Sequence, residues 1–252
     1  MTIVGTGHRL AGQMTTEALA YVRAAKKLLY IADSLTESWL QQQNPTGETL
    51  RQYYAPGKPR RTTYRQMADR IMQAVRKDSP VCAAFYGHPG VLVNATHDVL
   101  RRARREGHNA RMLPGISAQD CFIADLGIDL AMNGFQSFEA TEFLLRKRKY
   151  DPSCALILWQ IGNVGVADYR RQHKNWNAEG FGLLADKLAK IYGVRHKAIV
   201  YEASAYPICE PSIQRMPLGR LTEAEISISS LLYVPPSRTA PWDAPMARRL
   251  NW

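Results

Sequence analysis

The fold of this chain is decided by the stretch Phe85-Tyr86-Gly87-His88-Pro89-Gly90-Val91-Leu92. A continuous apolar run from Val81 to Phe85 leads into it, which is typical of a strand buried on both faces of a sheet. Open α/β sheets bind their ligands at the carboxyl ends of parallel strands, where the chain turns. Tyr86 and His88 stand in this Gly/Pro turn, so the sequence predicts a ligand site here.

The amino-terminal region has the pattern of a β-α-β unit. Thr2 to Val4 and Leu28 to Ala32 predict two strands, and Thr15 or Thr16 can cap a helix between them. Such a unit predicts a parallel sheet with a right-handed crossover. Its glycine turn suggests a dinucleotide fold, but the G-x-G-x-x-G fingerprint needs a glycine where this chain has Leu10. A nicotinamide cofactor is therefore disfavoured.

A long irregular segment runs from Asn44 to Arg61. Loops of this length inside a compact domain are usually functional or disordered. This loop carries Tyr54 and Arg60, and Tyr64 follows at the start of the next predicted helix. On composition alone, a substrate-binding loop and a solvated basic loop with tyrosines packed at its base are equally compatible with the pattern.

Several helix starts are predicted from capping residues. Ser117, with Asp120 three residues later, resembles a capping box that begins a helix over Ala118 to Leu126. The amides at this start, with the Ser117 hydroxyl, would form either a donor cluster for a polar ligand or a plain helix cap, and the sequence leaves both open. Further caps are expected at Thr62 or Thr63, at Thr96, and at Thr222 with Glu225.

The chain divides near Gly127, where the regular pattern loosens. We expect an amino-terminal α/β domain over residues 1–126, a carboxyl-terminal α/β domain over 127–236 and an irregular tail over 237–252. At 252 residues and 46% hydrophobic content, each domain has enough apolar residues for its own core.

The composition limits the kinds of partner that the protein is expected to bind. The net charge of +11 is carried by basic runs without interleaved aromatic residues, which favours solvated faces over a nucleic-acid groove and leaves an acidic peptide partner open. The four cysteines lack metal-ligand or disulfide spacing, so no metal site is expected. No apolar run approaches the ~20 residues of a membrane helix, and no signal peptide is visible. We expect a cytoplasmic protein without membrane or nucleic-acid partners.

The strand-end turns carry a family resemblance. The segments Val4–Gly7, Tyr86–Val91, Met112–Ala118 and Gln160–Gly162 look like successive motifs of the tetrapyrrole methylase superfamily, which uses S-adenosylmethionine. More narrowly, the stretch from Gln52 to Met67, with its tyrosines and Arg60, and the stretch Ser117–Cys121 resemble the borosin peptide backbone α-N-methyltransferases. The resemblance extends from about Thr2 to Pro236, nearly the whole chain.

This resemblance implies a two-domain α/β fold, with a mainly parallel sheet in the amino-terminal domain and a mixed sheet in the carboxyl-terminal domain. It also implies a homodimer and S-adenosylmethionine bound between the domains. The residues carried over to the cofactor are His88, Val91, Leu92, Ser117, Ala118, Gln160, Tyr201, Ala203, Ser230 and Leu231. Those carried over to the substrate amide, as catalytic residues, are Tyr54, Arg60, Tyr64 and Tyr86.

The implied reaction is methylation of backbone amides in a ribosomally made precursor peptide. A peptide nitrogen is a poor nucleophile because its lone pair is delocalised into the carbonyl. Arg60 could hold negative charge on the carbonyl oxygen or lower the pKa of a neighbouring tyrosine. Tyr64 or Tyr54 could then take the proton while Tyr86 positions the amide, and the sequence leaves the proton's path open.

Two further expectations concern the partner and the alternatives. Fungal borosin enzymes carry the substrate at their carboxyl terminus, whereas the stretch after Pro236 has no apolar core-peptide segment. We therefore expect a separate substrate polypeptide, giving a heterotetramer of two enzyme and two substrate chains; truncation of a fused precursor is the rival explanation. The alternative functions are a small-molecule methylase of the corrinoid/porphyrin type and a noncatalytic module that binds cofactor and peptide.

Overall fold

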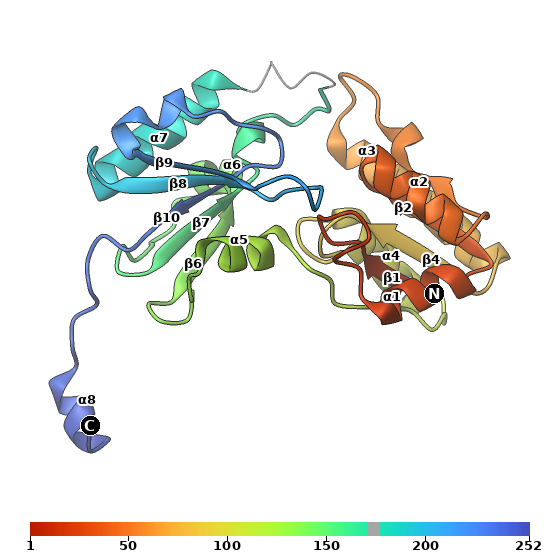
Figure 1. The fold of residues 1–252 in the computed structure, drawn as a ribbon, viewed down its shortest axis with the longest axis horizontal. Helices are drawn as coiled ribbons and strands as arrows, with labels where there is room; N and C mark the ends of the chain where they lie inside the picture. Colours follow the sequence, from red (N-terminus) through yellow and green to blue (C-terminus); the bar gives the residue numbers. More distant parts are fainter. Residues whose placement is uncertain (171–176) are drawn as a thin grey trace. The chain divides into compact units, whose positions relative to one another are not determined.

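A computed structural model describes residues 1–170 and 177–252 (Figure 1). These residues form two compact units. The first unit comprises Met1–Gly127, Ala203–Ser212 and Val166–Asn175, the last of which is described as far as Arg170. The second unit comprises Ile128–Gly165, Trp176–Glu202 and Ile213–Trp252. The sequence-based division treats 127–236 as one continuous domain, whereas here two later segments of the chain join the first unit.

The first unit is built on a five-stranded sheet with the order β3-β2-β4-β1-β5. Each pair of neighbouring strands in this sheet is parallel, and the central strand is the predicted apolar run. The two-domain α/β fold and the predicted parallel sheet are thus confirmed. The strands are β1 (Thr2–Gly5), β2 (Lys27–Ile31), β3 (Glu48–Thr49), β4 (Val81–Phe85) and β5 (Arg111–Met112).

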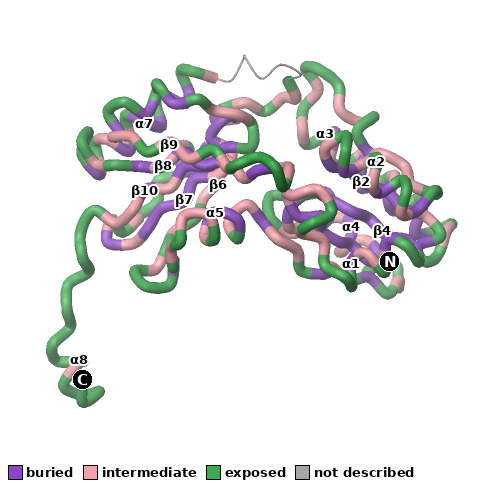
Figure 2. The backbone as a smooth tube through the Cα atoms, viewed as in Figure 1, coloured by how far each residue is buried: buried purple, intermediate pink, exposed green. Residues whose placement is uncertain are grey.

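Helices cover both faces of this sheet, because successive side chains of a strand point to opposite sides. Leu29 of β2 belongs to the apolar cluster formed with α3 and α4. Its neighbour Leu28 belongs to the cluster formed with α1 and α2. Figure 2 shows the resulting buried strands between partly exposed helices. The covering helices are α1 (Thr16–Ala24), α2 (Ser34–Gln43), α3 (Arg60–Lys77) and α4 (Asn94–Arg105), and α5 (Ala118–Leu126) follows β5 in the chain.

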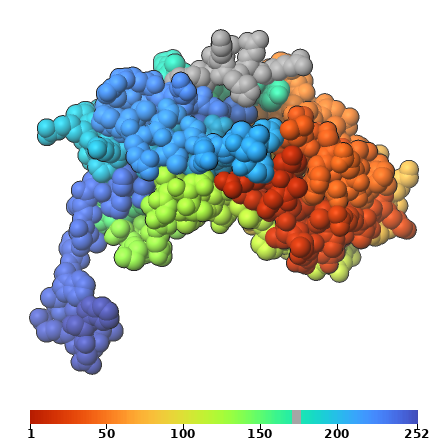
Figure 3. Space-filling model, viewed as in Figure 1, coloured from red at the N-terminus to blue at the C-terminus, as the bar shows by residue number. Residues whose placement is uncertain are grey.

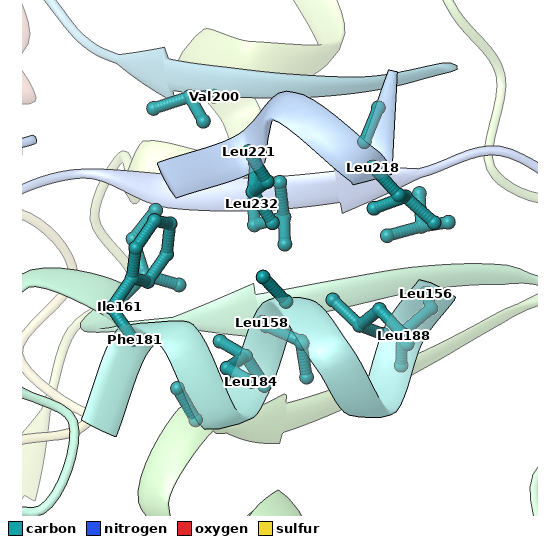
Figure 4. Packing of buried hydrophobic residues seen from close by; sticks show 14 of the residues in the cluster. Leu156, Leu158, Ile161, Phe181, Leu184, Leu188, Val200, Leu218, Leu221 and Leu232 are labelled. Atoms are coloured by element: carbon teal, nitrogen blue, oxygen red, sulfur yellow. The ribbon is translucent and has the colours of Figure 1, made fainter. Parts of the chain in front are cut away.

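The second unit contains a mixed sheet with the order β6-β7-β10-β8-β9. Strand β6 runs parallel to β7, and β10 runs antiparallel to both β7 and β8. Helix α7 and the 3₁₀ helix η3 pack on this sheet through one apolar cluster, which Figure 4 shows around Leu158, Leu184 and Leu232. The elements are β6 (Phe135–Glu139), α6 (Ala140–Leu145), β7 (Ala155–Trp159), η2 (Ile161–Asn163), α7 (Ala178–Tyr192), β8 (Lys197–Glu202), β9 (Ser212–Pro217), η3 (Leu218–Glu223) and β10 (Leu231–Val234).

The ends of β1, β4 and β5 converge where glycines allow backbones to touch. A Cβ atom on Gly5 would lie 2.3 Å from the Gly87 carbonyl oxygen and 2.8 Å from Cδ of Pro89. A Cβ atom on Gly115, which follows β5, would lie 3.2 Å from the Gly5 Cα. Gly87 also has a φ of 65°, a left-handed conformation that favours glycine. We call Gly5, Gly87, Pro89 and Gly115 the glycine junction.

Three predicted helix starts differ from the structure. Helix α3 begins at Arg60, before Thr62 and Thr63, and Pro59 precedes it without a side-chain cap. Helix α4 begins two residues before Thr96, whose hydroxyl contacts the preceding turn instead. Thr222 lies inside η3 rather than at the start of a helix. The cap at Thr15 and the capping box at Ser117 are confirmed.

The tail is more ordered than its sequence predicts. Residues Ala244–Arg249 form the short helix α8, and the Asp243 side chain accepts a hydrogen bond from the Met246 amide at its start. The proline at the second helical position is compatible with this start because the first turn has no intrahelical use for its N–H. Across residues 1–170 and 177–252, no helix combines the length and the apolar character that a membrane crossing requires.

The glycine junction can be tested by Gly5→Ala. Both atoms that the new methyl group would meet belong to the backbone or to a proline ring, so relief requires the strand ends to move apart. We expect the free energy of unfolding to fall by about 3 kcal/mol, measured by urea denaturation. Gly12→Ala, whose Cβ would find its nearest neighbour at 3.7 Å, is the control and should change it by less than about 1 kcal/mol. Equal stability of both variants would contradict the close approach.

Glu48 offers a test by pH. Its carboxylate accepts bonds from Arg70 Nε at 2.8 Å and Nη2 at 2.5 Å and pairs with Lys27 Nζ at 2.8 Å. The hydrogen bonds from Arg70 are the main reason why the pKa of Glu48 lies below 4.5. Glu48→Gln should cost about 2 kcal/mol of unfolding free energy at pH 7.

A carboxylate with a lowered pKa stabilises the fold above its unfolded pKa and loses that contribution as the pH falls through the folded value. The difference between Glu48→Gln and wild type should therefore shrink below about pH 4.5, in urea titrations at several pH values. Glu223→Gln removes an exposed carboxylate that pairs with Arg220 and should leave the unfolding free energy nearly unchanged, because water screens such a pair. A penalty for Glu48→Gln that is independent of pH would contradict this electrostatic account.

Candidate active site

Tyr86 is fixed by hydrogen bonds between adjacent strand ends. Its amide donates to the Ile31 carbonyl at 3.1 Å, and the Gly87 amide donates to the Gly7 carbonyl at 2.8 Å. The Tyr86 side chain is 53% exposed although the strand before it is buried. The structure therefore projects this tyrosine from the carboxyl end of β4, as the sequence predicts.

The turn after Tyr86 is braced from within. His88 Nδ1 accepts a bond from the Gly90 amide at 2.9 Å. The hydroxyl of Thr96, which is fully buried, lies 2.6 Å from the Pro89 carbonyl oxygen. Leu92 adopts a positive φ of 57°, which is uncommon for a bulky residue and is found mostly where function demands it. The turn thus holds exposed apolar side chains in an unusual backbone conformation at a strand end.

The irregular segment of the sequence is in fact folded tightly. It contains β3 and the 3₁₀ helix η1 (Arg51–Tyr53), and Tyr54 follows η1 directly. Lys58 Nζ donates to the Tyr53 carbonyl at 2.6 Å and also to the side chain of Gln66. Residues 55–57 of the segment are exposed, while Tyr53 and Tyr54 pack against the core of the first unit, so both sequence interpretations stay open.

Arg60 is the first residue of α3, where the helix dipole is positive. An arginine at this place costs stability, and the first turn of α3 holds no acidic residue to compensate. A cation that the helix does not favour is a reason to look for a function in binding or catalysis.

Tyr54, Tyr64, Tyr86 and Arg60 interact with one another. Burial is the main cause that raises the pKa of Tyr54 well above its ordinary value, and the neighbouring Tyr64 and Tyr86 raise it further. A side-chain hydrogen bond with Tyr64 acts in the same direction. Arg60 lowers this pKa, but its effect is the last of those that act. Arg60 thus acts on the pKa of Tyr54 in the direction that the sequence-based hypothesis expects, but burial and the neighbouring tyrosines outweigh it.

Tyr86 has neighbours of its own. Loss of solvent around the hydroxyl raises the pKa of Tyr86, and Arg60 again opposes the shift, although water still reaches this half-exposed side chain. The ring of His8 meets the Tyr86 ring edge to face, with centroids 6.4 Å apart. Burial lowers the pKa of His8, against the attraction of Asp120. Sequence analysis missed His8, because a histidine in a glycine loop carries no pattern that points to Tyr86.

Ser117 forms the predicted capping box. Its hydroxyl accepts bonds from the Gln119 and Asp120 amides, and its own amide donates to the Asp120 carboxylate at 2.6 Å. Ala118, the first residue of α5, lies next to this cap. A role of Ser117 and Ala118 in ligand binding stays a prediction.

Four cofactor candidates meet in the second unit. Gln160 has a positive φ of 57°, and the following Ile161 amide donates to the Ser230 carbonyl at 3.3 Å. Leu231 is the antiparallel partner of Tyr201 in the sheet. The side chains of Tyr201, Ser230 and Leu231 are buried, so a ligand here would meet backbone atoms and the Gln160 side chain first.

Two later segments of chain join the first unit through hydrogen bonds. The segment that contains Ala203 is tied to the amino-terminal loop, since the Leu10 amide donates to the Ala205 carbonyl at 3.1 Å. Figure 3 shows the blue surface of this segment against the red surface of the loop. The segment Val166–Arg170 pairs with the loop that carries Tyr54, and Tyr169 stacks on Tyr54. Sequence analysis missed both associations, because neither segment has a periodic pattern.

No metal centre is evident in the part of the chain that the structure describes. Groups of three or more histidine, cysteine, aspartate or glutamate residues arranged to hold an ion do not occur among these residues. The polar groups of the candidate site are instead phenols and a guanidinium, which suit proton transfer and charge stabilisation on an organic substrate.

Comparison with known families agrees with the geometry. Residues 1–208 match the tetrapyrrole (corrin/porphyrin) methylases. The chain belongs to this family. The matched range includes the turns after β4 and β5 and the loop that carries Tyr54.

Several methyltransferase/precursor proteins have similar sequences. A methyltransferase/ribosomally synthesized cyclic peptide gymnopeptides precursor of Gymnopus fusipes is 40% identical over all of this chain and 60% of its own length. The omphalotin A precursor of Omphalotus olearius is 40% identical over all of this chain and 61% of its own length. A type III borosin cyclic peptide precursor of Anomoporia bombycina is 36% identical over the whole chain and 30% of its own length. The chain thus spans about 60% of the first two relatives.

Solved structures share the fold. Uroporphyrin-III-C-methyltransferase from Thermus thermophilus superimposes with a TM-score of 0.64 over 97% of both chains, at 17% identity. The same enzyme complexed with S-adenyl homocysteine gives a TM-score of 0.59 at 18% identity, over 97% of this chain and 98% of that one. These likenesses confirm the expected two-domain methylase architecture.

The bracing of the turn after Tyr86 predicts the effect of Thr96→Val. The substitution keeps the shape of the side chain but removes the proton that the hydroxyl offers to the Pro89 and Val93 carbonyls, at 2.6 and 2.8 Å. We expect a loss of about 1–2 kcal/mol in unfolding free energy, together with faster hydrogen exchange of the Val91 amide, which bonds to the His88 carbonyl. Thr222→Val, at an exposed position, is the control. Unchanged exchange at Val91 would show that Thr96 does not hold the turn.

Proposed function

We propose that this protein transfers methyl groups from S-adenosylmethionine to backbone amide nitrogens of a ribosomally made peptide. The observation that carries the proposal is the interacting set Tyr54, Tyr64, Tyr86 and Arg60, which lies beside the strand-end turn of a methylase. Relatives whose names combine a methyltransferase with a ribosomally synthesized cyclic peptide precursor support the peptide as substrate.

The proposed cofactor residues offer surfaces of the right kind. In the first unit, Val91 and Leu92 are exposed apolar side chains beside His88, and Ala118 and Ala203 add small ones. In the second unit, Gln160 supplies an amide beside Ser230 and the Tyr201–Leu231 pair. Apolar walls with a few placed polar groups are typical of sites for organic cofactors. When bound, S-adenosylmethionine supplies an electrophilic methyl group on a sulfonium. Ser117, at the cap of α5, is proposed to contribute as well.

The amide must be activated before it can accept a methyl group. Its nitrogen lone pair is shared with the carbonyl, so removal of the N–H proton must be accompanied by stabilisation of negative charge on the oxygen. Arg60 provides a permanent positive charge for this purpose. Tyr86, projecting from β4 with a fixed backbone, positions the amide.

Tyr64 is the tyrosine best suited to take the proton. Burial and the neighbouring tyrosines keep the Tyr54 hydroxyl protonated, which makes Tyr54 a poor base. Tyr64 shares a side-chain hydrogen bond with Tyr54, and we assign it the role of base. This assignment gives Tyr54 a supporting role and makes Tyr64 the base. The sequence alone leaves the path of the proton open.

The partner follows from the same chemistry. The substrate is a peptide whose backbone can lie against Tyr86 and Arg60, and an acidic leader would match the net charge of +11. Delivery of the peptide as a separate polypeptide and assembly as a homodimer, or as a heterotetramer with two substrate chains, stay predictions. A tetrapyrrole substrate, which the family name favours, is the competing function.

Mass spectrometry tests the proposal directly. The chain is co-expressed with the product of a neighbouring small open reading frame, and the peptide is sequenced by fragmentation. We expect increments of one methyl group located on backbone nitrogens. Tyr64→Phe and Arg60→Ala should each lower the methylation rate by about 10²-fold or more, because each removes a group that acts on the reacting amide.

The control is Arg61→Ala, which removes the neighbouring exposed arginine and should retain most of the activity. Methylation of a tetrapyrrole with no methylation of peptide would establish the competing function. Wild-type rates for both Tyr64→Phe and Arg60→Ala, in folded proteins, would overturn the assigned roles.

A further inference from the structure

A short antiparallel ladder holds the loop that carries Tyr54 and Arg60. The Gly57 amide donates to the Tyr169 carbonyl at 3.0 Å, and the Tyr169 amide donates to the Lys58 carbonyl at 3.0 Å. The Arg60 amide donates to the Ala167 carbonyl at 3.1 Å. The loop is thus bonded on its outer side by a segment that lies far away in sequence, within the same unit.

The ladder also brings one side chain onto the candidate site. The ring of Tyr169 packs on the ring of Tyr54, with centroids 4.6 Å apart and planes inclined by 39°. Tyr54 is therefore restrained on two sides, by the Tyr169 ring and by its hydrogen bond to Tyr64. Aromatic contacts at this separation are attractive and depend on orientation.

We propose that Tyr169 is a positioning residue, which holds the ring of Tyr54 so that its hydroxyl stays directed at Tyr64. This inference rests on the proposed function, since it assigns Tyr169 a part in the same proton transfer. Tyr169 itself acts only through Tyr54, and its hydroxyl is not required. What matters is the face of its ring.

The role of the ring can be separated from the role of the segment. The ladder uses the backbone amide and carbonyl of Tyr169, and both remain in Tyr169→Ala. The loop also has its own bracing, through Lys58 and the Tyr53 carbonyl. Removal of the ring should therefore free Tyr54 without unfolding the loop.

Steady-state kinetics provide the first test. Tyr169→Ala should lower kcat for peptide methylation by about tenfold with little change in KM, because substrate binding is kept and alignment is lost. Tyr169→Phe should retain wild-type rates. In a Tyr54→Phe background, Tyr169→Ala should cost less than about twofold, because the hydroxyl that it positions is already absent. Losses that multiply in the double variant would overturn the proposal.

Tyr150 supplies a matched control. Its ring packs on Phe143 in the second unit, with centroids 5.3 Å apart and an inclination of 41°. Tyr150→Ala removes a comparable contact away from the candidate site and should leave kcat unchanged. A similar fall in kcat for both variants would mean that the effect of Tyr169→Ala is only a general loosening of the fold.

A second readout does not depend on activity. The protein is labelled with 3-fluorotyrosine, and the ¹⁹F resonance of Tyr54 is assigned from its loss in Tyr54→Phe. Tyr169→Ala should move or broaden this resonance, whereas Tyr169→Phe should leave it in place. An unchanged resonance in Tyr169→Ala would overturn the contact. If the wild-type protein methylates no peptide, the proposed function fails, and the ¹⁹F result still decides whether Tyr169 holds Tyr54.

Discussion

The candidate site depends on a steric constraint, the contact of three strand ends through glycine. At Gly5 and Gly115 the backbones come so close that a methyl group would meet a carbonyl oxygen or a neighbouring Cα. This contact fixes the carbonyl of Gly87 and the ring of Pro89, and so sets the direction in which β4 ends. The positions of Tyr86 and of the exposed apolar turn after it follow from that direction. The lack of a Cβ atom at Gly5 and Gly115 therefore fixes where Tyr86 and its turn lie.

A second constraint is electrostatic and limits what Arg60 can do. A guanidinium beside phenols favours phenolate, yet burial and the neighbouring tyrosines outweigh it at Tyr54. Burial thus keeps Tyr54 protonated despite the nearby Arg60. In the proposed proton transfer, Tyr54 can therefore support a second tyrosine but does not take the proton itself. Arg60 stands beside these phenols although it lies at the start of α3, where the helix dipole disfavours a cation.

Local patterns predicted much of this fold. The apolar run of β4, the β-α-β unit and the capping box at Ser117 each depend on residues close in sequence, and each is confirmed. The start of α3 at Arg60 was not predictable in this way, because it has no capping side chain and carries charge of the wrong sign. Strands β6 and β9 lie at sheet edges with few buried side chains, so they lack the pattern of a core strand. The pairing of Val166–Arg170 with the tyrosine loop depends on tertiary contacts alone.

The fold of this family does not by itself determine the reaction, which depends on the candidate residues. A fold does not determine a substrate, and the fold shared with uroporphyrin-III-C-methyltransferase concerns the arrangement of strands and helices. Methyl transfer to an electron-rich carbon requires chiefly that the acceptor be brought to the methyl group, whereas an amide nitrogen must first lose its proton. A set of phenols beside an arginine offers groups for that additional requirement, and a simple binding trough for an anionic macrocycle would not need them. The proposed peptide substrate therefore rests on Tyr54 after η1, on Arg60 and Tyr64 in the first turns of α3, and on Tyr86 after β4.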